Sequence, residues 1–382
     1  MKEERITELD SVRGIAAFTV LIHHCLLAIP VIFNLYFSHD VYSAPAFMKF
    51  LIFSPFHIFW NGHAAVILFF ILSGFVLSIS YYDHSRYNYP GYVVKRFFRL
   101  YIPYFVIITI SALLLDFAHS NNGIDSFSVW FNKMWSKKIS LWEYCQLLFF
   151  KGDYHNICTT LWTIVVEIKI SLLLPFFYML IKKMSFMKNM LFALAYTALF
   201  QVLVLKNVVE HIPALRDFYY LPFFLFGGII YKYRQEVRGS KLVSRSALYI
   251  ICVVIALLYN WEWIFPWFRK GTDHYIYRFI NDYMVAAASC LLIMICILNI
   301  ASVKKALNHS VFAFLGRISY SLYLIHPVIL LFAVYNFRSV QYGYIAIMVV
   351  VASVFLSYIY YLLVEKPSIN LGRYLGSLVK KR

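Results

Sequence analysis

The chain has 382 residues, of which 62% are hydrophobic and 14% are charged. Its mean hydropathy of +0.70 excludes a soluble globular domain and indicates a polytopic membrane protein. The formal net charge of +17 is spread over short basic clusters between apolar segments. This pattern sets the orientation of membrane helices, and nucleic acid is not an expected partner. We therefore expect an all-α bundle of transmembrane helices surrounded by membrane lipid.

Ten apolar segments reach the roughly 20 residues that a membrane-spanning helix needs. Their approximate limits are 12–34, 62–82, 101–118, 159–181, 189–206, 217–233, 246–264, 279–301, 317–336 and 343–364. The connecting segments on one side carry roughly twice as many Lys and Arg residues as those on the other, which predicts that both termini are cytoplasmic. Residues 1–382 are expected to form one transmembrane domain with a short basic tail from about 366. No signal-peptide cleavage site follows the first span, which should remain as an anchor.

The first predicted span places a charged and a titratable side chain on one face. Arg13 and His24 are eleven positions apart, close to three helical turns, so they share a stripe and lie about 16 Å apart along the axis. Such groups are costly in lipid, and the stripe should face the protein interior or a water-filled cavity. His23, about 100° away on the helix, is the control position whose replacement should matter less.

A basic cluster opens the third span. Lys95, Arg96 and Arg99 lie on its first turns, with the two arginines on one face at i, i+3. Several donors in one place can clamp a phosphorylated ligand. Anchoring to anionic lipid headgroups explains the same cluster. The residues by themselves leave both interpretations open.

Two further charges, Glu167 and Lys169, lie inside the span 159–181. Residues two positions apart point to nearly opposite sides of a helix, so each is expected to need its own partner. An intramembrane carboxylate is a candidate functional group. A salt bridge to an arginine of a neighbouring helix, with Arg13 as one candidate, is the structural alternative.

The ninth span, 317–336, carries three polar groups in lipid, Ser319, Tyr320 and His326. His326 is nine positions from Arg317 and therefore about half-way round the helix from it. We expect a hydrogen-bonded structural role for this histidine.

The cysteines and the loop histidines do not predict a metal site. The six cysteines are scattered without a C-x-x-C motif, and only Cys145 and Cys158 lie where a disulfide is conceivable. His39, His57 and His63 in the loop 35–63 are expected to be polar surface groups.

Six patterns occur in order along the chain. They are L-D-x-x-R-G-x-A-A at 9–17, F-F-I-L-S-G-F-V-L at 69–77, K-R-F-F-R-L-Y-I-P at 95–103, L-W-T-x-x-x-E at 161–167, I-S-Y-S-L-Y-L-I-H-P at 318–327 and V-E-K-P at 364–367. As an ordered set they resemble the acyltransferase-3 family of bacterial membrane O-acyltransferases. The resemblance covers the chain from end to end, in the stand-alone form without a C-terminal esterase-like domain.

The resemblance implies a ten-helix enzyme of the bacterial cytoplasmic (inner) membrane. It would move an acyl group, usually acetyl, from cytoplasmic acyl-CoA to a hydroxyl of a cell-surface or lipid-linked glycan such as O-antigen or exopolysaccharide. Acyl-CoA is then a co-substrate, and no bound cofactor or metal is expected. Matched by position, the catalytic residues are His24, as the general base, and Arg13, which helps to position the donor, and Lys95, Arg96 and Arg99 bind acyl-CoA. Candidates for supporting the site or binding the acceptor are Asp10, Trp162, Glu167, Ser319, Tyr320 and His326.

Acyl transfer to a hydroxyl requires removal of the hydroxyl proton, and a histidine with a pKa near the operating pH contributes roughly 10²–10⁴-fold. The thioester is already activated, so no covalent intermediate is required, although an acyl-enzyme through His24 stays open. An alternative of another class is a multi-pass transporter or flippase in which intramembrane Arg, His and Glu side chains form a relay.

Overall fold

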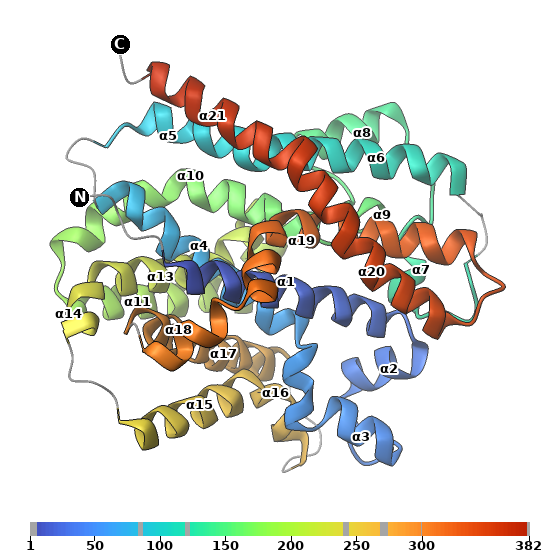
Figure 1. Cartoon of the computed structure of the whole chain (residues 1–382), viewed down its shortest axis with the longest axis horizontal. Helices are drawn as coiled ribbons and strands as arrows, with labels where there is room; N and C mark the ends of the chain where they lie inside the picture. Colours follow the sequence, from blue (N-terminus) through green and yellow to red (C-terminus); the bar gives the residue numbers. More distant parts are fainter. Residues whose placement is uncertain are drawn as a thin grey trace.

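The computed structural model describes residues 6–82, 87–118, 123–239, 244–267, 274–298 and 300–379. Within these ranges the chain is built from helices joined by short connections, and no strand occurs (Figure 1). The all-α prediction is therefore confirmed for this part of the chain. Residues 380–382, which belong to the predicted basic tail, lie outside it.

Long helices form the body of the bundle, and short helices connect them. The long helices are α1 (Thr7–Leu27), α4 (Gly62–Tyr82), α6 (Ile102–Ala118), α10 (Leu161–Lys183), α11 (Phe186–Leu205), α15 (Arg245–Tyr259), α17 (His274–Ile297), α19 (Ser310–Asn336) and α20 (Tyr342–Tyr360). The shorter α-helices are α2 (Pro30–Ser38), α3 (Ala46–Ile52), α5 (Tyr89–Arg96), α7 (Val129–Asn132), α8 (Leu141–Leu148), α9 (Tyr154–Ile157), α12 (Val208–His211), α13 (Leu221–Lys232), α14 (Arg234–Gly239), α16 (Trp261–Ile264), α18 (Ala301–Leu307) and α21 (Lys366–Leu378). Three 3₁₀ helices, η1 (Pro55–Phe59), η3 (Pro213–Tyr220) and η4 (Phe265–Trp267), and two π-helical turns, η2 (Phe97–Tyr101) and η5 (Tyr361–Glu365), complete the described elements.

Seven helical segments of the described residues are long and apolar enough to cross a membrane, or nine if two bent pairs each count as one span. The predicted first span is one of the bent pairs, because α1 ends at Leu27 and α2 continues at 107° to it. Pro30 stands in the first turn of α2, where proline is tolerated, whereas it would break a continuous helix.

The predicted sixth span, 217–233, differs from a full membrane helix. Its α-helix, α13, has 12 residues, and about 18 Å of helix is shorter than the hydrocarbon core of a bilayer. The count of ten spans and the cytoplasmic position of both termini stay predictions.

Helix α1 runs through the middle of the bundle and packs against α19 and α4 (Figure 1). It crosses α19 where Gly14 meets Gly316, and a Cβ on either glycine would collide with the backbone of the other helix. The two helices run parallel, because Glu8, before this crossing, accepts a hydrogen bond of 3.1 Å from Asn308, which precedes α19. Small residues allow this close approach, on which helix packing in a membrane depends.

Two further crossings use glycines in the same way. Gly74 of α4 and Gly227 of α13 each abut the backbone of the other helix, and Gly91 of α5 abuts Gly376 of α21. The segment from 366, predicted as a tail, is therefore a helix packed on α5 as far as Leu378.

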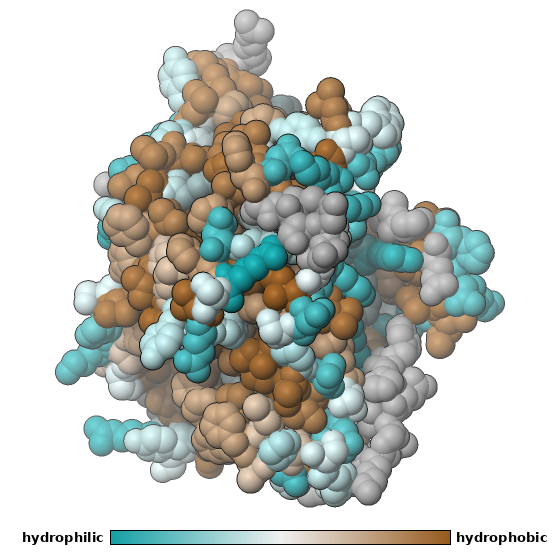
Figure 2. All heavy atoms as spheres, turned by 90° about the vertical axis from the view of Figure 1, so that its right-hand side faces the viewer, coloured by the Kyte–Doolittle hydropathy of each residue, from teal (hydrophilic) through white to brown (hydrophobic). Residues whose placement is uncertain are grey.

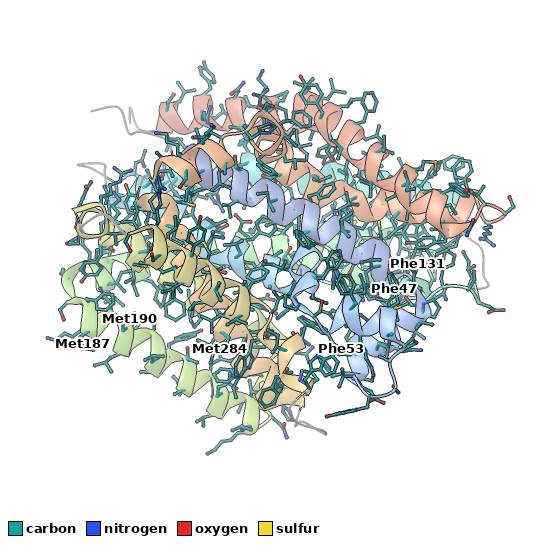
Figure 3. The ribbon with its side chains drawn as sticks, turned by 60° about the horizontal axis from the view of Figure 1, so that its bottom comes forward. Phe47, Phe53, Phe131, Met187, Met190 and Met284 are labelled. Carbon is teal, nitrogen blue, oxygen red and sulfur yellow. The ribbon has the colours of Figure 1, made fainter. Side chains whose placement is uncertain are left out.

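The outer surface is rich in hydrophobic side chains. On α11, Leu191, Leu194 and Leu199 expose 57%, 50% and 59% of their surface. Figure 3 shows Met187 and Met190 of the same helix at the edge of the molecule, and Figure 2 shows broad hydrophobic patches on another face. Apolar exposure on this scale fits a surface in contact with lipid rather than water.

All six cysteines are described, and all are free. The disulfide that was conceivable between Cys145 and Cys158 is therefore not formed. Cys158 is buried instead, with its Sγ 3.3 Å from Thr160 Oγ1.

Replacement of Gly14 by alanine should separate α1 from α19. The new Cβ meets the backbone of Gly316, and overpacking of this kind costs about 1–3 kcal/mol. We expect a lower melting temperature in detergent, measured by size-exclusion chromatography after heating. Gly343→Ala on α20 is the control, because a Cβ there has nothing within 4 Å. Equal melting temperatures for the two variants would contradict the close crossing.

Candidate active site

A narrow cavity of about 30 Å³ lies between α1, α4, α10 and α19. Arg13 of α1 and Glu167 of α10 are its charged lining residues, and Ser319 and Tyr320 of α19 lie beside them. The other lining residues are Val66, Phe69, Phe70, Ser73, Thr163, Ile164 and Tyr323. Four residues singled out in the sequence thus meet in one place, with room for water-sized groups.

His24, further along α1, is hydrogen-bonded to His326 of α19, Nδ1 to Nε2 at 2.8 Å. The Nδ1 of His326 lies 2.8 Å from the carbonyl oxygen of Leu322. A carbonyl oxygen only accepts, so His326 donates from Nδ1, and its Nε2 accepts the proton of His24 Nδ1. The neutral His24 ring then presents an unprotonated Nε2, which has no hydrogen-bond partner among the described residues. This is the tautomer that a general base requires.

Trp130, from the segment before α10, lies next to His24, and His155 of the same segment lies against Trp130. The ring of Trp130 is 5.1 Å from the His24 ring, and the His155 ring is 6.1 Å from Trp130. His155 is partly buried, with its Nδ1 2.9 Å from Thr159 Oγ1, and burial lowers its pKa. Neutral aromatic rings therefore surround the histidine end of the stripe.

His23 has a different environment from its neighbour. It is buried, its Nδ1 lies 3.0 Å from the carbonyl oxygen of Trp60, and its ring packs against Tyr36 at 5.2 Å. His23 thus holds the segment before α4 against α1. Its replacement tests folding more than chemistry.

Glu167 pairs directly with Arg96, with Arg96 Nη2 2.9 Å from Glu167 Oε1, and Ser73 Oγ donates to the same oxygen at 3.3 Å. The paired side chains are only 9% and 14% exposed. Arg13, the partner considered from the sequence, interacts with Glu167 electrostatically. The Nε atoms of Arg13 and Arg96 are buried without a partner in the described part of the chain. Unpaired buried donors of this kind can hydrogen-bond a water molecule or a bound anion.

Arg99 joins the same group of charges, because it interacts electrostatically with Glu167, Glu365 and Arg13. Glu365 is buried and accepts a hydrogen bond of 2.6 Å from Ser321 of α19. We call this set the arginine cluster; it consists of Arg13, Arg96, Arg99, Glu167 and Glu365. Three cations and two carboxylates leave it one formal positive charge, which favours an anionic ligand.

Both Arg99 and Glu365 lie in π-helical turns, η2 and η5. A π turn departs from the α-helical hydrogen-bond pattern, and such turns are frequent at functional sites. Within η2 the carbonyl oxygen of Leu100 accepts a hydrogen bond of 3.0 Å from the Tyr320 hydroxyl. Tyr320 therefore ties α19 to the turn that carries Arg99.

Three residues named from the sequence neither line the cavity nor belong to the arginine cluster or the His24–His326 pair. The backbone of Asp10 lies against Gly316 at the crossing of α1 and α19. Lys95 is exposed on α5, and Trp162 is partly buried on α10. Their expected roles in binding or support stay predictions.

Lys169 has a partner of its own, Asp217 of η3, with Nζ 2.5 Å from Oδ2. The prediction that Glu167 and Lys169 do not pair with each other is confirmed. The pair also ties η3 to α10.

Three residues of the site, Glu365, Thr163 and Tyr323, were not singled out from the sequence. The hydroxyls of Thr163 and Tyr323 lie 2.8 Å apart, and both residues line the cavity. Each of the three stands inside one of the six ordered patterns, which was the available signal.

The loop histidines are not the polar surface groups that were expected. His57 is fully buried and stacks on Trp263, with ring centroids 4.0 Å apart. His39 and His63 are 14% and 13% exposed, and each is bonded to a buried carboxylate. Among the described residues no group of three or more His, Cys, Asp or Glu side chains could hold a metal ion.

The family model described as acyltransferase domain matches residues 6–362. The chain is similar to the O-acetyltransferase PaAT-1 of Phomopsis amygdali, with 25% identity over 273 residues that cover 62% of this chain and 50% of that protein. The chain thus spans about half the length of the curated relative that it matches. No solved structure matches it.

Removal of one partner of the Arg96–Glu167 pair should destabilise the protein. Arg96→Met leaves the Glu167 carboxylate buried without its direct partner, which costs about 3–5 kcal/mol. We expect a lower melting temperature in detergent, and recovery of most of the loss in the Arg96→Met, Glu167→Met double variant. Lys95→Met, at an exposed neighbouring position, is the control. A double variant as unstable as the single one would show that the unpaired charge is not the cause.

Proposed function

Because the chain belongs to the acyltransferase family whose model covers residues 6–362, we propose that it moves an acyl group, usually acetyl, from cytoplasmic acyl-CoA to a hydroxyl of a glycan. It is a multi-pass membrane protein and an acyltransferase. The similarity to an O-acetyltransferase supports a hydroxyl as the acceptor. A cell-surface or lipid-linked glycan, and a place in a bacterial cytoplasmic membrane, are parts of the proposal.

The observation that carries the proposal is the order of the groups along α1. Arg13 belongs to the arginine cluster and lines the cavity, and His24 presents its base nitrogen about 16 Å further along the helix. Acyl-CoA has the same polarity, with anionic phosphates at one end and the reactive thioester at the other. The stripe therefore suits a donor whose phosphates lie towards Arg13 and Arg99 and whose thioester reaches towards His24.

In the proposed reaction the acceptor hydroxyl gives its proton to His24 Nε2 while its oxygen attacks the thioester carbonyl carbon. The new C–O bond forms, the C–S bond breaks, and the CoA thiolate takes the proton from His24. An ester and free CoA result, so atoms and charge balance without a covalent enzyme intermediate. His326 is a positioning residue, because it keeps the proton of His24 on Nδ1.

The transporter alternative is less well supported. A relay needs charged groups that exchange partners, whereas Glu167 is bonded to Arg96 at 2.9 Å and Lys169 to Asp217 at 2.5 Å. Family membership also supports acyl transfer.

His24→Ala should abolish acetylation of the host glycans while the protein still accumulates in the membrane, because His24 takes the hydroxyl proton in the proposed reaction. Mass spectrometry of surface glycans from cells with the wild-type or variant gene measures this as the mass of one acetyl group, and it identifies the acceptor.

His326→Gln should keep more activity than His326→Ala, because the glutamine amide oxygen can accept the His24 Nδ1 proton. Retained acetylation in His24→Ala would remove the base assignment, and equal activities of the two His326 variants would remove the positioning role.

Arg99→Ala should weaken binding of acetyl-CoA in detergent by about 10–100-fold, the value of one hydrogen bond to a charged group. Isothermal titration calorimetry measures the dissociation constant. Lys95→Ala should have a smaller effect, because Lys95 is exposed. Arg373→Ala, an exposed arginine of α21, is the control and should bind as the wild type does. Unchanged binding in Arg99→Ala would instead favour a lipid-anchoring role for this arginine.

A further inference from the structure

The imidazole of His63 lies outside the cavity, at the first turn of α4. His63 Nε2 is 2.6 Å from Oδ1 of Asp282 on α17. The other carboxylate oxygen of Asp282 accepts a hydrogen bond of 2.7 Å from the Tyr219 hydroxyl of η3. Asp282 is buried, so three separate elements of the bundle hold this imidazole and carboxylate in place.

The hydrogen bonds show which ring nitrogen of His63 is free. A carboxylate oxygen accepts, so His63 donates from Nε2, and in the neutral ring Nδ1 carries the lone pair. Nδ1 has no hydrogen-bond partner among the described residues and is not one of the fully buried atoms. A histidine oriented by a carboxylate, with its other nitrogen open, can accept a hydrogen bond from a hydroxyl.

The His63–Asp282 pair lies at the end of α4 that is near His23 and His24. Gly62, the residue before His63, abuts the ring of His23, the neighbour of His24. Ser73, ten residues later on α4 and so about 15 Å away along the axis, bonds Glu167 in the arginine cluster. His63 is therefore on the side of the site away from the proposed phosphate positions.

Aromatic rings link the pair to the cavity. Tyr220 follows Tyr219 in η3, and its ring lies 4.9 Å from Phe70 of the cavity wall and 5.5 Å from Trp162. Rings beside a fixed hydrogen-bonding group suit a saccharide, which has apolar C–H faces and hydroxyl edges.

A nearby pair shows what a purely structural histidine looks like. His39 is 3.1 Å from Glu262, whose other oxygen is bonded to Asn281 at 2.9 Å. The His39 ring stacks nearly flat on Trp263, with an interplanar angle of 16°. Trp263 thus covers the face of the His39 ring, whereas no aromatic ring stacks on His63 in the part of the chain that the structure describes.

We propose that the His63–Asp282 pair is a binding point for the acceptor, at which His63 Nδ1 accepts a hydrogen bond from a hydroxyl of a neutral saccharide. This inference rests on the proposed function, and it assigns the acceptor side of the same site. It involves no bond making or breaking, because the reacting hydroxyl is deprotonated by His24.

The test uses the full-length protein in liposomes, with acetyl-CoA as the donor and the membrane saccharide fraction from cells that lack the gene as the acceptor. His63→Ala should raise the half-saturating saccharide concentration about tenfold or more, and the half-saturating acetyl-CoA concentration should stay unchanged. Tyr219→Phe, which deletes one oxygen atom, should shift the saccharide value in the same direction by less. His39→Phe, which keeps an aromatic ring on Trp263, is the matched control and should shift neither value.

An unchanged saccharide value in folded His63→Ala overturns the inference. So does an equal shift in His39→Phe, since the effect would then belong to the packing of the loop. Failure of the wild type to transfer any acetyl group overturns the proposed function instead, which keeps the two failures distinct.

Discussion

The close crossing of α1 and α19 is the constraint on which the rest of the site depends. Gly14 and Gly316 let the two backbones meet, and both histidines stand ten residues beyond their glycine, at His24 and His326. Because the helices run parallel, equal rises of about 15 Å bring the two rings together. The same crossing sets Arg13 against the part of α19 that lines the cavity. A side chain at the crossing would move both ends of the stripe at once.

Burial of the arginine cluster costs desolvation free energy, and this cost indicates that the cluster has a function other than stabilising the fold. Replacing a buried ion pair by apolar groups is often neutral or stabilising, so such a pair is weak evidence of a structural role. Here Arg96 and Glu167 neutralise each other, while Arg99 is carried in by a π-helical turn and the cluster keeps one positive charge. Buried Nε donors of Arg13 and Arg96 remain for a ligand.

The two ends of the site have opposite chemistry, and this gives it a direction. Cations gather where Ser73 meets Glu167, and neutral imidazole and aromatic rings gather around His24. In the proposed reaction, an anionic donor and a neutral hydroxyl acceptor would approach from different ends of α4, towards the point where His24 is held by His326. The short helix η3 supports the neutral end through the hydrogen bond of Tyr219 to Asp282, and the ion pair of Asp217 with Lys169 ties it to α10.

The sequence by itself determined the helical membrane architecture, because hydropathy reports directly on the solvent that each segment tolerates. Helical periodicity was enough to place Arg13 and His24 on one face, and to show that Glu167 and Lys169 need separate partners. The six ordered patterns were enough to indicate the family, which the match over residues 6–362 established.

Only the tertiary structure decided which groups meet across helices. Glu167 forms an ion pair with Arg96, and His326 forms a hydrogen bond with His24. His63, expected at the surface, is bonded to a buried aspartate that is 219 residues away in the chain. Periodicity describes positions along one helix, whereas partners depend on which helices are neighbours and in what register they cross. That register is set by close backbone contacts such as the one at Gly14, and no local pattern of hydrophobic residues records them.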